Sequence, residues 1–234
     1  MPPDSLIAEH RAVQNAAKAV LASLASKISA HATERSIAET AYQELCVLGF
    51  PETWYYKCPA FVLSGSRSCL SISGRDYVPS SEAIGQFNVV TVDLSPMRNG
   101  RWGDCARSFY IEGGCVVSDP VSPALASGNH FLQALHAEMR TTVYPEMKFQ
   151  ELYDWANDRI KASGFENLDF LGNVGHSIAT RREDRQYIEA KNMRLLKEVP
   201  FFTFEPHVRE VDGIWGFKHE NIFYFNQDGC VELL

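Results

Sequence analysis

Residues 89–109, VVTVDLSPMRNGRWGDCARSF, decide the fold that this sequence predicts. The stretch is an apolar run that contains a carboxylate, a turn-forming Asn99-Gly100 pair, and a second run with another carboxylate. Asn-Gly between β-type segments is a strong signal for a two-residue β-hairpin. Counting back from that turn places Asp93 opposite Ala106 and sets Asp104 on the same face of the hairpin, diagonal to Asp93. The sequence therefore predicts two aspartates that converge on one face of a sheet.

A second hairpin is predicted near the C-terminus, around Asp212-Gly213. If these two residues form its turn, Glu205 lies directly opposite Glu220. Like charges that face each other across a sheet are destabilising, and a buried ionised carboxylate without a partner is costly. Arginine or lysine could compensate, but a divalent cation with oxygen ligands compensates several converging carboxylates at once. The two hairpins together indicate a metal site.

The order of helices and strands indicates an α+β fold built from two similar halves. A helix that ends at Gly49 and a later one that ends at Gly164 are followed, at a nearly constant offset, by the two acidic hairpins. Such a repeat would bring the hairpins face to face around a shared cleft. Helices are expected over 5–30, 34–47 (after the N-cap Thr33), 123–143 and 148–162, strands over 54–118 and from 168 onward, and a loop or short helix within 181–197.

The composition excludes several classes of protein. The chain has 234 residues, of which 45% are hydrophobic, so it can bury a full core as one large domain or two small ones. A net charge of -7 without a basic block argues against nucleic acid or an anionic membrane as partner. No apolar run is long enough for a membrane helix, the N-terminus lacks the features of a secretory signal, and the six cysteines contain no C-x-x-C pair. We expect a cytoplasmic protein with reduced thiols.

A histidine in the segment GNVGHSI, residues 172–178, adds a candidate nitrogen ligand. With it, five residues resemble, in order and approximate spacing, the metal ligands of the pita-bread metallopeptidases, which include methionine aminopeptidase, the Xaa-Pro aminopeptidases, the prolidases and creatinase. Their contexts are similar too: VTVDLSP resembles the strand before the first ligand, GDCARSF resembles G-x-x-D-x-T-R-x-F, GHSI resembles G-H-G-I, FFTFEPHV resembles T-x-E-P, and FKHENIFYF resembles the terminal R-I-E-D strand. The resemblance extends from about Thr33 to Leu234. The five residues are Asp93, Asp104, His176, Glu205 and Glu220.

This resemblance implies the pita-bread fold, a pseudo-twofold antiparallel β-sheet covered by helices, with a dinuclear metal site. By the same resemblance we expect a single catalytic domain, 1–234, with no separate N-terminal domain before it. It implies that Asp93 chelates one ion, that His176 and Glu205 hold the other, and that Asp104 and Glu220 bridge both. Divalent manganese, iron, cobalt or zinc would suit these ligands. In the family the metal pair activates a bridging water and polarises the scissile carbonyl. The implied function is hydrolysis of a C–N bond in a small peptide or amino-acid derivative.

Two histidines that accompany the ligands in this family are replaced here. Asp76 stands at the first position, in a segment similar to H-Y-x-P, and ungapped counting from His176 places Glu183 at the second. In the peptidases these histidines donate hydrogen bonds to the substrate carbonyl and to the tetrahedral oxyanion, which an ionised carboxylate cannot do. His207, on the same strand face as Glu205, is a candidate replacement donor. An arginine cluster is a candidate for binding a substrate carboxylate or phosphate: Arg181, Arg182 and Arg185.

Three interpretations of the function stay open at this point. The first is a dinuclear metallohydrolase resembling the Xaa-Pro and methionine aminopeptidases. The second is a metalloenzyme of altered chemistry, in which an oxidisable metal such as iron acts on a small metabolite, and the carboxylate substitutions favour it. The third is a non-catalytic binding protein that retains the fold, against which the retention of all five ligands argues. The expected partner is a small molecule or short peptide, and a homodimer is left open.

Overall fold

The computed structural model describes every residue, 1–234. Its four α-helices are α1 (Asp4–Leu24), α2 (Glu34–Val47), α3 (Pro123–Thr142) and α4 (Phe149–Ala162). The strands are β1 (Glu52–Thr53), β2 (Ala60–Ser64), β3 (Phe87–Leu94), β4 (Pro96–Arg98), β5 (Arg101–Trp102), β6 (Cys105–Glu112), β7 (Cys115–Val117), β8 (Phe165–Asn167), β9 (Phe202–Phe204), β10 (His207–Glu210), β11 (Phe217–Lys218), β12 (Asn221–Phe225) and β13 (Val231–Leu233). Short 3₁₀ turns are η1 (Gly65–Cys69), η2 (Arg182–Asp184) and η3 (Leu196–Glu198). None of the helices combines the length and apolar character that crossing a bilayer needs.

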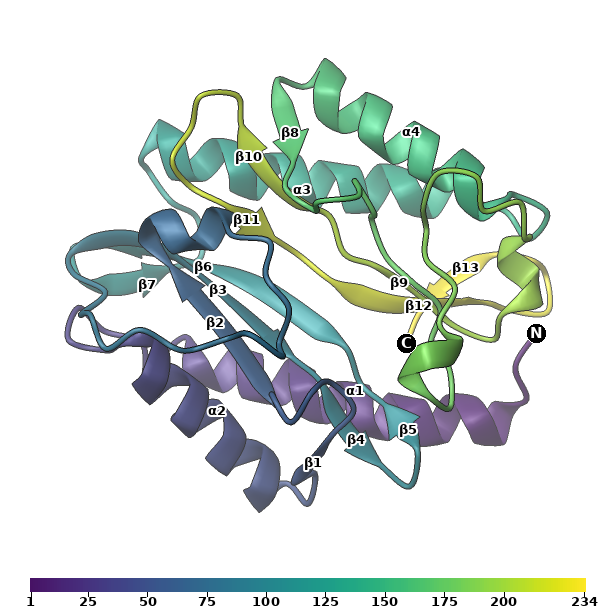
Figure 1. Ribbon diagram of the computed structural model, residues 1–234, viewed down its shortest axis with the longest axis horizontal. Coiled ribbons are helices and arrows are strands. Elements are labelled where there is room, and N and C mark those ends of the chain that lie inside the picture. Colours follow the sequence, from purple (N-terminus) through teal and green to yellow (C-terminus); the bar gives the residue numbers. More distant parts are fainter.

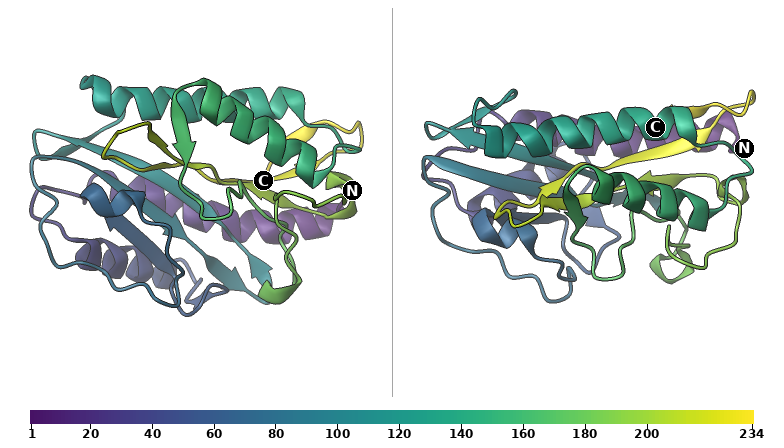
Figure 2. Two further views of the ribbon diagram at one scale, coloured as in Figure 1. Left: turned by 45° about the horizontal axis from the view of Figure 1, so that its top comes forward. Right: turned by 90° about the horizontal axis from the view of Figure 1, so that it is seen from above.

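The strands lie between two pairs of helices, with α1 and α2 on one side and α3 and α4 on the other (Figure 1). The left view of Figure 2 shows the same layers from another direction. Every strand pairing is antiparallel, in the orders β2-β3-β6-β7, β1-β4-β5, β11-β10-β8 and β13-β12-β9. The predicted α+β class is confirmed.

Each pair of helices buries its apolar face against its own half of the strands. A cluster of 17 buried residues joins α1 and α2 to β2, β3 and β6, with Leu24, Leu45 and Val92 fully buried. A cluster of 23 joins α3 and α4 to the strands of the second half, including Leu152 and Phe204. Burying one such side chain stabilises the fold by roughly 1.5–3 kcal/mol, so both halves are held firmly. The functional site forms between these two cores, where the halves meet.

The first hairpin has the predicted register. Asp93 pairs with Ala106 across β3 and β6, and the same register continues through β4 and β5 to the turn. Asn99 and Gly100 have φ angles of 53° and 71°, as a type I′ turn requires at both central positions. The turn therefore fixes which face of the hairpin carries the two aspartates.

The second hairpin keeps the predicted register but not the predicted turn. Pairing of His207 with Lys218 on one side, and of Phe204 with Asn221 on the other, places Glu205 opposite Glu220, as expected. The chain does not close at Asp212-Gly213 as a two-residue turn, because β10 ends at Glu210 and β11 begins only at Phe217. The reason lies in β8, which pairs with β10 along its other edge, and the N–H of Val211 donates to Gly164 O at the end of α4. The loop is wider than a hairpin turn, yet the register survives.

Two contacts join the halves close to the site. The N–H of Glu220 donates to Ala106 O at 3.0 Å. Ser108 Oγ accepts from the N–H of Lys218 at 2.8 Å and donates to Lys218 O at 3.1 Å. Because β6 contacts both β11 and the start of β12 in this way, the acidic residues of the two hairpins face one another.

The predicted helices agree with the structure, with one correction. The helix expected over 5–30 ends at Leu24. Beyond it the chain joins the β6–β7 turn, since Ser29 bridges Cys115 and the N–H of Ala30 donates to Gly114 O. Backbone pairing with a strand thus replaces the last helical turn and a half, while Ile28 remains buried. The helix at 34–47 has the expected bounds, and Thr33 forms a capping box with Ser36.

Candidate metal centre

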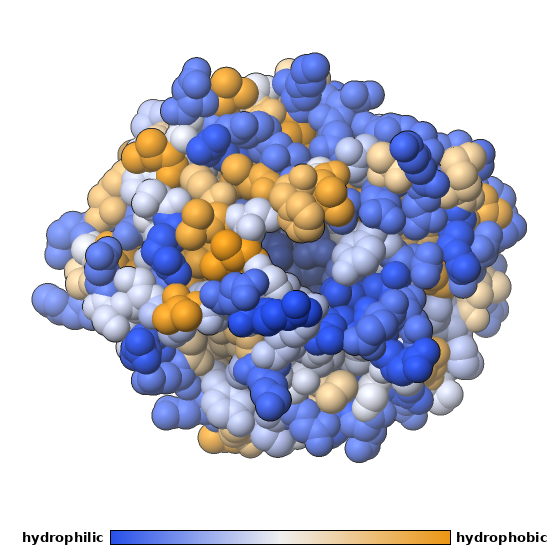
Figure 3. All heavy atoms as spheres, in the orientation of Figure 1, coloured by the Kyte–Doolittle hydropathy of each residue, from blue (hydrophilic) through white to orange (hydrophobic).

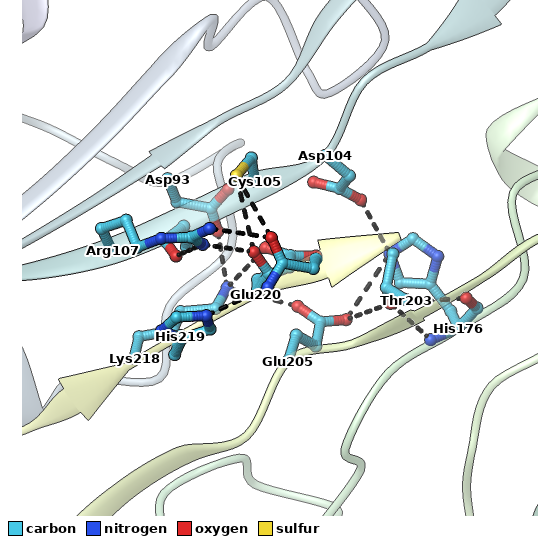
Figure 4. A network of polar contacts seen from close by, with 12 residues as sticks. Asp93, Asp104, Cys105, Arg107, His176, Thr203, Glu205, Lys218, His219 and Glu220 are labelled. Atoms are coloured by element: carbon cyan, nitrogen blue, oxygen red, sulfur yellow. Dashed lines mark hydrogen bonds and ion pairs between the residues drawn. The ribbon is translucent and has the colours of Figure 1, made fainter. Parts of the chain in front are cut away.

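The five predicted ligands meet where the two halves join (Figure 4). His176 Nε2 lies 3.4 Å from Asp104 Oδ2 and 3.6 Å from Glu205 Oε1. Asp104, His176 and Glu220 each direct one ligand atom into a volume in which these atoms lie within 4.8 Å of one another. Asp93 is connected to the group by Lys218, whose Nζ is 2.5 Å from Asp93 Oδ2 and also contacts Glu205. Residues from β3, β11 and four connecting segments thus form one cluster.

The backbone of Asp104 is held by a helix that sequence reasoning did not connect with the site. Gln14 of α1 accepts from the Asp104 N–H and donates to Asp104 O, both at 2.8 Å. Gln14 is fully buried, and it falls on the apolar face of α1 beside Val13 and Ala17. A glutamine at a buried helical position needs partners for its amide, and this was the available signal.

The backbone of Glu220 is held by Arg107. The guanidinium of Arg107 donates to Glu220 O at 2.6 Å and to Asn221 Oδ1 at 2.8 Å, while the thiol of Cys105 lies 3.5 Å from the same Glu220 carbonyl. Arg107 therefore orients a ligand and leaves the Glu220 carboxylate free. His219 points to the opposite side, as strand alternation predicts, and packs against His136 at a ring-centroid distance of 4.3 Å.

His176 presents an unprotonated ring nitrogen to the acidic residues. Burial, with a contribution from nearby Arg185, lowers the pKa of His176 to about 3, so its ring is neutral. Its Nδ1 lies 3.0 Å from Ser177 O, and because a carbonyl only accepts, Nδ1 carries the proton. Nε2 is then unprotonated and faces Asp104 and Glu205. A neutral imidazole with one nitrogen fixed by a backbone carbonyl is the form in which histidine binds metals.

Asp104 and Glu220 have buried oxygens without partners. Asp104 Oδ2 and both Glu220 carboxylate oxygens receive no hydrogen bond. Burial first, and then the charges of neighbouring carboxylates, raise the pKa values of both side chains well above the usual range. Buried acceptors of this kind need a donor or a cation. One imidazole among carboxylates suits manganese, iron, cobalt or zinc better than magnesium or calcium, so these residues fit a divalent transition metal.

The cluster opens into a pocket of about 480 Å³. One end of the pocket is acidic, with Asp93, Asp104 and Glu205, and Arg185 lies beside it. The rest of the wall mixes polar side chains with aromatic and apolar ones, among them Tyr55, Tyr56, Phe61, Leu70, Phe170 and Leu171. Figure 3 shows the hollow near the middle of this face, with hydrophobic side chains along part of its rim. The volume suits a small organic molecule or a short peptide.

The three residues proposed from sequence as catalytic do not share one location. Asp76 and Glu183 are exposed and lie outside the pocket wall, and Glu183 pairs with Arg182 at 2.8 Å. His207 does line the pocket, but its Nε2 donates to Ser68 O at 2.7 Å. Burial lowers the pKa of His207 to about 4, so its other nitrogen can only accept a hydrogen bond. Its predicted role as a donor to the substrate remains a prediction.

Of the three arginines in the predicted cluster, Arg185 is the one whose guanidinium reaches the pocket. Its Nη1 lies 3.5 Å from His176 Nε2, and its guanidinium stacks over Trp54 and Tyr187 at 5.0 and 5.2 Å. Its neighbours in the cluster pair with carboxylates, Arg181 with Asp184 and Arg182 with Glu183, whereas Arg185 has no carboxylate partner. The sequence identified the cluster but could not single out this member.

Comparison with known proteins agrees with this geometry. The chain matches the model of "Metallopeptidase family M24" over residues 8–227. No curated protein matches it. Among solved structures it is similar to X-Pro aminopeptidase from Thermotoga maritima MSB8, with a TM-score of 0.81 and 17% identity over 99% of this chain and 60% of that one.

Two further structures show the same fold. For Xaa-Pro dipeptidase from Bacillus anthracis the TM-score is 0.82 at 19% identity, over 100% of this chain and 61% of that one. For prolidase from Pyrococcus furiosus the TM-score is 0.74 at 20% identity, over 96% and 63%. The chain thus spans about three-fifths of the length of the structures it matches. The pita-bread fold implied by the sequence motifs is confirmed.

Proposed function

The chain belongs to metallopeptidase family M24, and from this premise we propose that it is a metal-dependent hydrolase. Its proposed reaction is cleavage of a C–N amide bond in a small substrate with a free carboxylate, such as a dipeptide or an N-acyl amino acid. One observation carries the proposal: Asp104 and Glu220, whose buried oxygens receive no hydrogen bond, converge with the unprotonated Nε2 of His176, with one ligand atom from each residue within 4.8 Å of the others. Leaving such acceptors buried costs free energy that a bound cation would recover.

A divalent ion held by Asp104, His176 and Glu220 would act as a Lewis acid on the amide carbonyl and lower the pKa of a bound water. The chain's own groups arrange the rest. Gln14 and Arg107 hold the backbones of two ligands without consuming their carboxylates. The Thr203 hydroxyl accepts from the His176 N–H at 2.9 Å, so the ligand histidine is fixed at its backbone as well as at its ring.

Arg185 supports the assignment of a carboxylate-bearing substrate. Stacking on Trp54 and Tyr187 fixes the plane of its guanidinium, and its Nε–H donates to Arg182 O at 3.0 Å. No carboxylate of the chain occupies the terminal nitrogens, and Nη1 makes only a 3.5 Å contact with His176 Nε2. The guanidinium therefore keeps the fork geometry that binds carboxylates through two parallel hydrogen bonds. A carboxylate seated there lies next to His176, which places an adjoining amide close to the metal ligands.

Apolar side chains in the pocket wall support an apolar group on the substrate. Phe170 is 80% exposed and Leu171 is 57% exposed, although both line the pocket. Large apolar side chains that stay exposed at a pocket mouth gain burial when a ligand covers them. Aromatic side chains from the other half, Tyr55 and Tyr56, complete that wall. A hydrophobic amino-acid side chain next to a free carboxylate matches both ends of the pocket.

The test is hydrolysis by protein stripped of metal and reloaded with Mn²⁺, Fe²⁺, Co²⁺ or Zn²⁺ in turn. Dipeptides and N-acyl amino acids are offered in pairs that differ only in a free or an amidated carboxylate, and products are measured by mass spectrometry. We expect the free acids to be cleaved ~10–100-fold more efficiently than the amides, the value of a charge-assisted hydrogen bond. Asp104→Asn is the inactive control. If no amide is cleaved with any of the four metals, the proposal fails.

One observation favours a second candidate, metal-dependent chemistry other than amide hydrolysis. No neutral histidine N–H is directed at the substrate, since Nδ1 of His176 and Nε2 of His207 donate to backbone carbonyls. Loss of one oxyanion donor typically costs ~10²–10³ in rate. The same incubations distinguish this candidate: oxygen uptake with the iron-loaded protein, together with intact amides, would support it.

A further inference from the structure

Tyr187 lies beside the ligand His176, across an isolated antiparallel bridge. The hydrogen bonds that frame this bridge are made by the residues on either side of the pair, as from the Ile188 N–H to Gly175 O at 2.8 Å. In such a non-hydrogen-bonded pair the two side chains leave the same face of the ladder and lie closest together. The side chain of Tyr187 therefore starts toward the side on which His176 meets the carboxylates.

The Tyr187 ring is held between two neighbours, and its hydroxyl is left free. The ring is edge-on to the imidazole of His176, with 6.0 Å between the ring centroids and 74° between the planes. The guanidinium of Arg185 stacks over it at 5.2 Å. The side chain is half-buried and lines the pocket. No hydrogen bond within the chain uses the hydroxyl, and the backbone carbonyl of Tyr187 accepts from Asn192 Nδ2 at 2.7 Å.

Two other tyrosines line the pocket, but their hydroxyls are bonded to the loop that follows η1. Tyr55 Oη accepts from the Gly74 N–H and Tyr56 Oη accepts from Arg75 Nη2, both at 3.3 Å. These contacts hold the two phenols against that loop. Tyr187 is the pocket tyrosine whose hydroxyl has no partner and whose ring adjoins a metal ligand.

The loop between His176 and Tyr187 explains why counting along the sequence did not find this residue. Ungapped counting places Glu183 at the position of the family's second histidine, yet Glu183 is exposed and lies outside the pocket. Residues 177–184 do not line the pocket at all, and the wall resumes at Arg185. The residue that returns to pair with the ligand is thus a tyrosine, whose O–H can donate a hydrogen bond as a neutral histidine N–H does.

Packing alone does not account for the hydroxyl. A phenylalanine would make the same contacts with His176 and Arg185 through its ring, so the hydroxyl is left with a bound molecule as its partner. Under the proposed function the substrate carboxylate binds Arg185. A substrate held there carries its adjoining amide past the phenol on which that guanidinium stacks.

We propose that the Tyr187 hydroxyl donates a hydrogen bond to the carbonyl oxygen of the scissile amide, in place of a missing histidine donor, and is a catalytic residue. This inference deepens the proposed function and rests on it for the reaction. As water adds to the carbonyl carbon, the carbonyl oxygen gains negative charge, and a donor directed at it contributes most at that moment. The phenol keeps its proton. The C–N bond then breaks, and the nitrogen leaves as an amine with a proton that comes from the added water.

The experiment measures binding as well as turnover. Unmodified protein and Tyr187→Phe, both loaded with Mn²⁺, are titrated by calorimetry with a phosphinic dipeptide, whose tetrahedral oxygens imitate the oxyanion, and with the free amino acid that hydrolysis would release. Tyr187→Phe should bind the phosphinate ~10–100-fold more weakly and the amino acid equally well, the effect of one lost hydrogen bond to a charged oxygen. In hydrolysis, kcat should fall by a similar factor with little change in KM.

Two controls test whether the effect is specific. Tyr153→Phe removes the hydroxyl of a half-buried tyrosine on α4, outside the pocket, and should leave both affinities and kcat unchanged. The Mn²⁺ affinity of Tyr187→Phe should equal that of the unmodified protein. A weaker Mn²⁺ affinity would overturn the inference, because the phenol would then act by positioning His176. An unchanged phosphinate affinity, or equal losses for the phosphinate and the amino acid, would overturn it too.

These measurements also separate the inference from the proposed function. Hydrolysis that is equally fast in Tyr187→Phe would overturn the inference and leave the hydrolase proposal standing. A selective loss of phosphinate affinity in a protein that cleaves no amide would support the donor role of Tyr187 and refute the hydrolase proposal. No binding of the phosphinate by the unmodified, metal-loaded protein would overturn both.

Discussion

Gly175→Ala is predicted to disrupt the site through the backbone, without touching a ligand. Gly175 precedes His176 and has φ +152°. A Cβ at this position would lie 2.3 Å from Thr203 O and 3.0 Å from Ile188 Cδ1. The nearer obstacle is backbone, and it cannot rotate away as a side chain could. The two segments are also tied together, because the Thr203 N–H donates to His176 O at 2.7 Å and the Glu205 N–H donates to Val174 O at 2.8 Å.

The magnitude follows from comparison with Gly164, at the end of α4. Gly164 has φ +80°, and nothing lies within 4 Å of a Cβ added there. Gly164→Ala should therefore cost only the backbone strain, roughly 1 kcal/mol. Gly175→Ala carries a similar backbone cost and adds forced separation of two hydrogen-bonded segments, for which overpacking in a core suggests about 1–3 kcal/mol or more. The difference between the two variants is therefore about 1–3 kcal/mol.

Urea and thermal unfolding of both variants, followed by circular dichroism in the presence of a chelator, measure this difference. For a domain of this size it corresponds to a melting temperature roughly 2–12 °C lower for Gly175→Ala than for Gly164→Ala. Calorimetry should also show weaker Mn²⁺ binding for Gly175→Ala and unchanged binding for Gly164→Ala, because the forced movement displaces His176 and Glu205. Equal stability of the two variants would refute the reasoning, since it would mean that the segment at Gly175 does not lie against β9 as closely as described.

Three further predictions concern single side chains. Arg185→Met should raise KM for a carboxylate-bearing substrate by ~10–100-fold with little change in kcat, because it loses a charge-assisted hydrogen bond to the substrate. Steady-state kinetics measure this, with Arg181→Met as the control, since the Arg181 guanidinium pairs with exposed Asp184. An unchanged KM for Arg185→Met would contradict the prediction. Asp104→Asn should weaken Mn²⁺ binding at least ~10-fold while the circular dichroism spectrum stays the same; calorimetry that shows equal affinity would exclude Asp104 as a ligand. Burial lowers the pKa of His136 to about 3. Below about pH 6.5 the unfolded chain therefore takes up a proton at His136 that the folded chain does not. Lowering the pH from 7.5 to 5.5 should reduce the free energy of unfolding by about 1.4 kcal/mol through this residue. Urea unfolding at the two pH values should show a smaller loss for His136→Gln, and identical losses would show that His136 titrates alike in both states.

The strand register could be predicted from sequence because two local rules determine it. Asn99-Gly100 specifies a two-residue turn, and the period of two along each strand then places Asp93 and Asp104 on one face. For the second hairpin the turn was wrong but the register was right. Apolar residues that must face a core constrain register as strongly as a turn does, and Val208 and Phe217 pair across that hairpin, both buried. A register predicted from sequence can therefore be right even when the predicted turn is wrong.

What the sequence could not provide depends on contacts between distant segments. The end of α1 is set by pairing of Ser29 with Cys115, a partner far along the chain. Gln14 meets Asp104 for the same reason, since α1 crosses the hairpin only in the folded molecule. Arg185 reaches His176 because the chain folds back between them, and Tyr187 bridges His176 in that return. None of these contacts has a local pattern.

Lys218 shows what the strand pattern does predict, because the alternation that places Glu220 on the site-facing side of the strand also applies to Lys218. Strand alternation places residues 218 and 220 on one face, so a lysine two positions before a metal ligand must face the same acidic cluster. The R-I-E-D motif carries an arginine at this position, so Lys218 keeps a cation there but replaces the planar guanidinium by a single ammonium. That ammonium lies within 3.2 Å of one oxygen each of Asp93 and Glu205. The ligand pattern thus identifies the fold and the kind of site, and the strand register adds the charged neighbour that offsets two of its carboxylates.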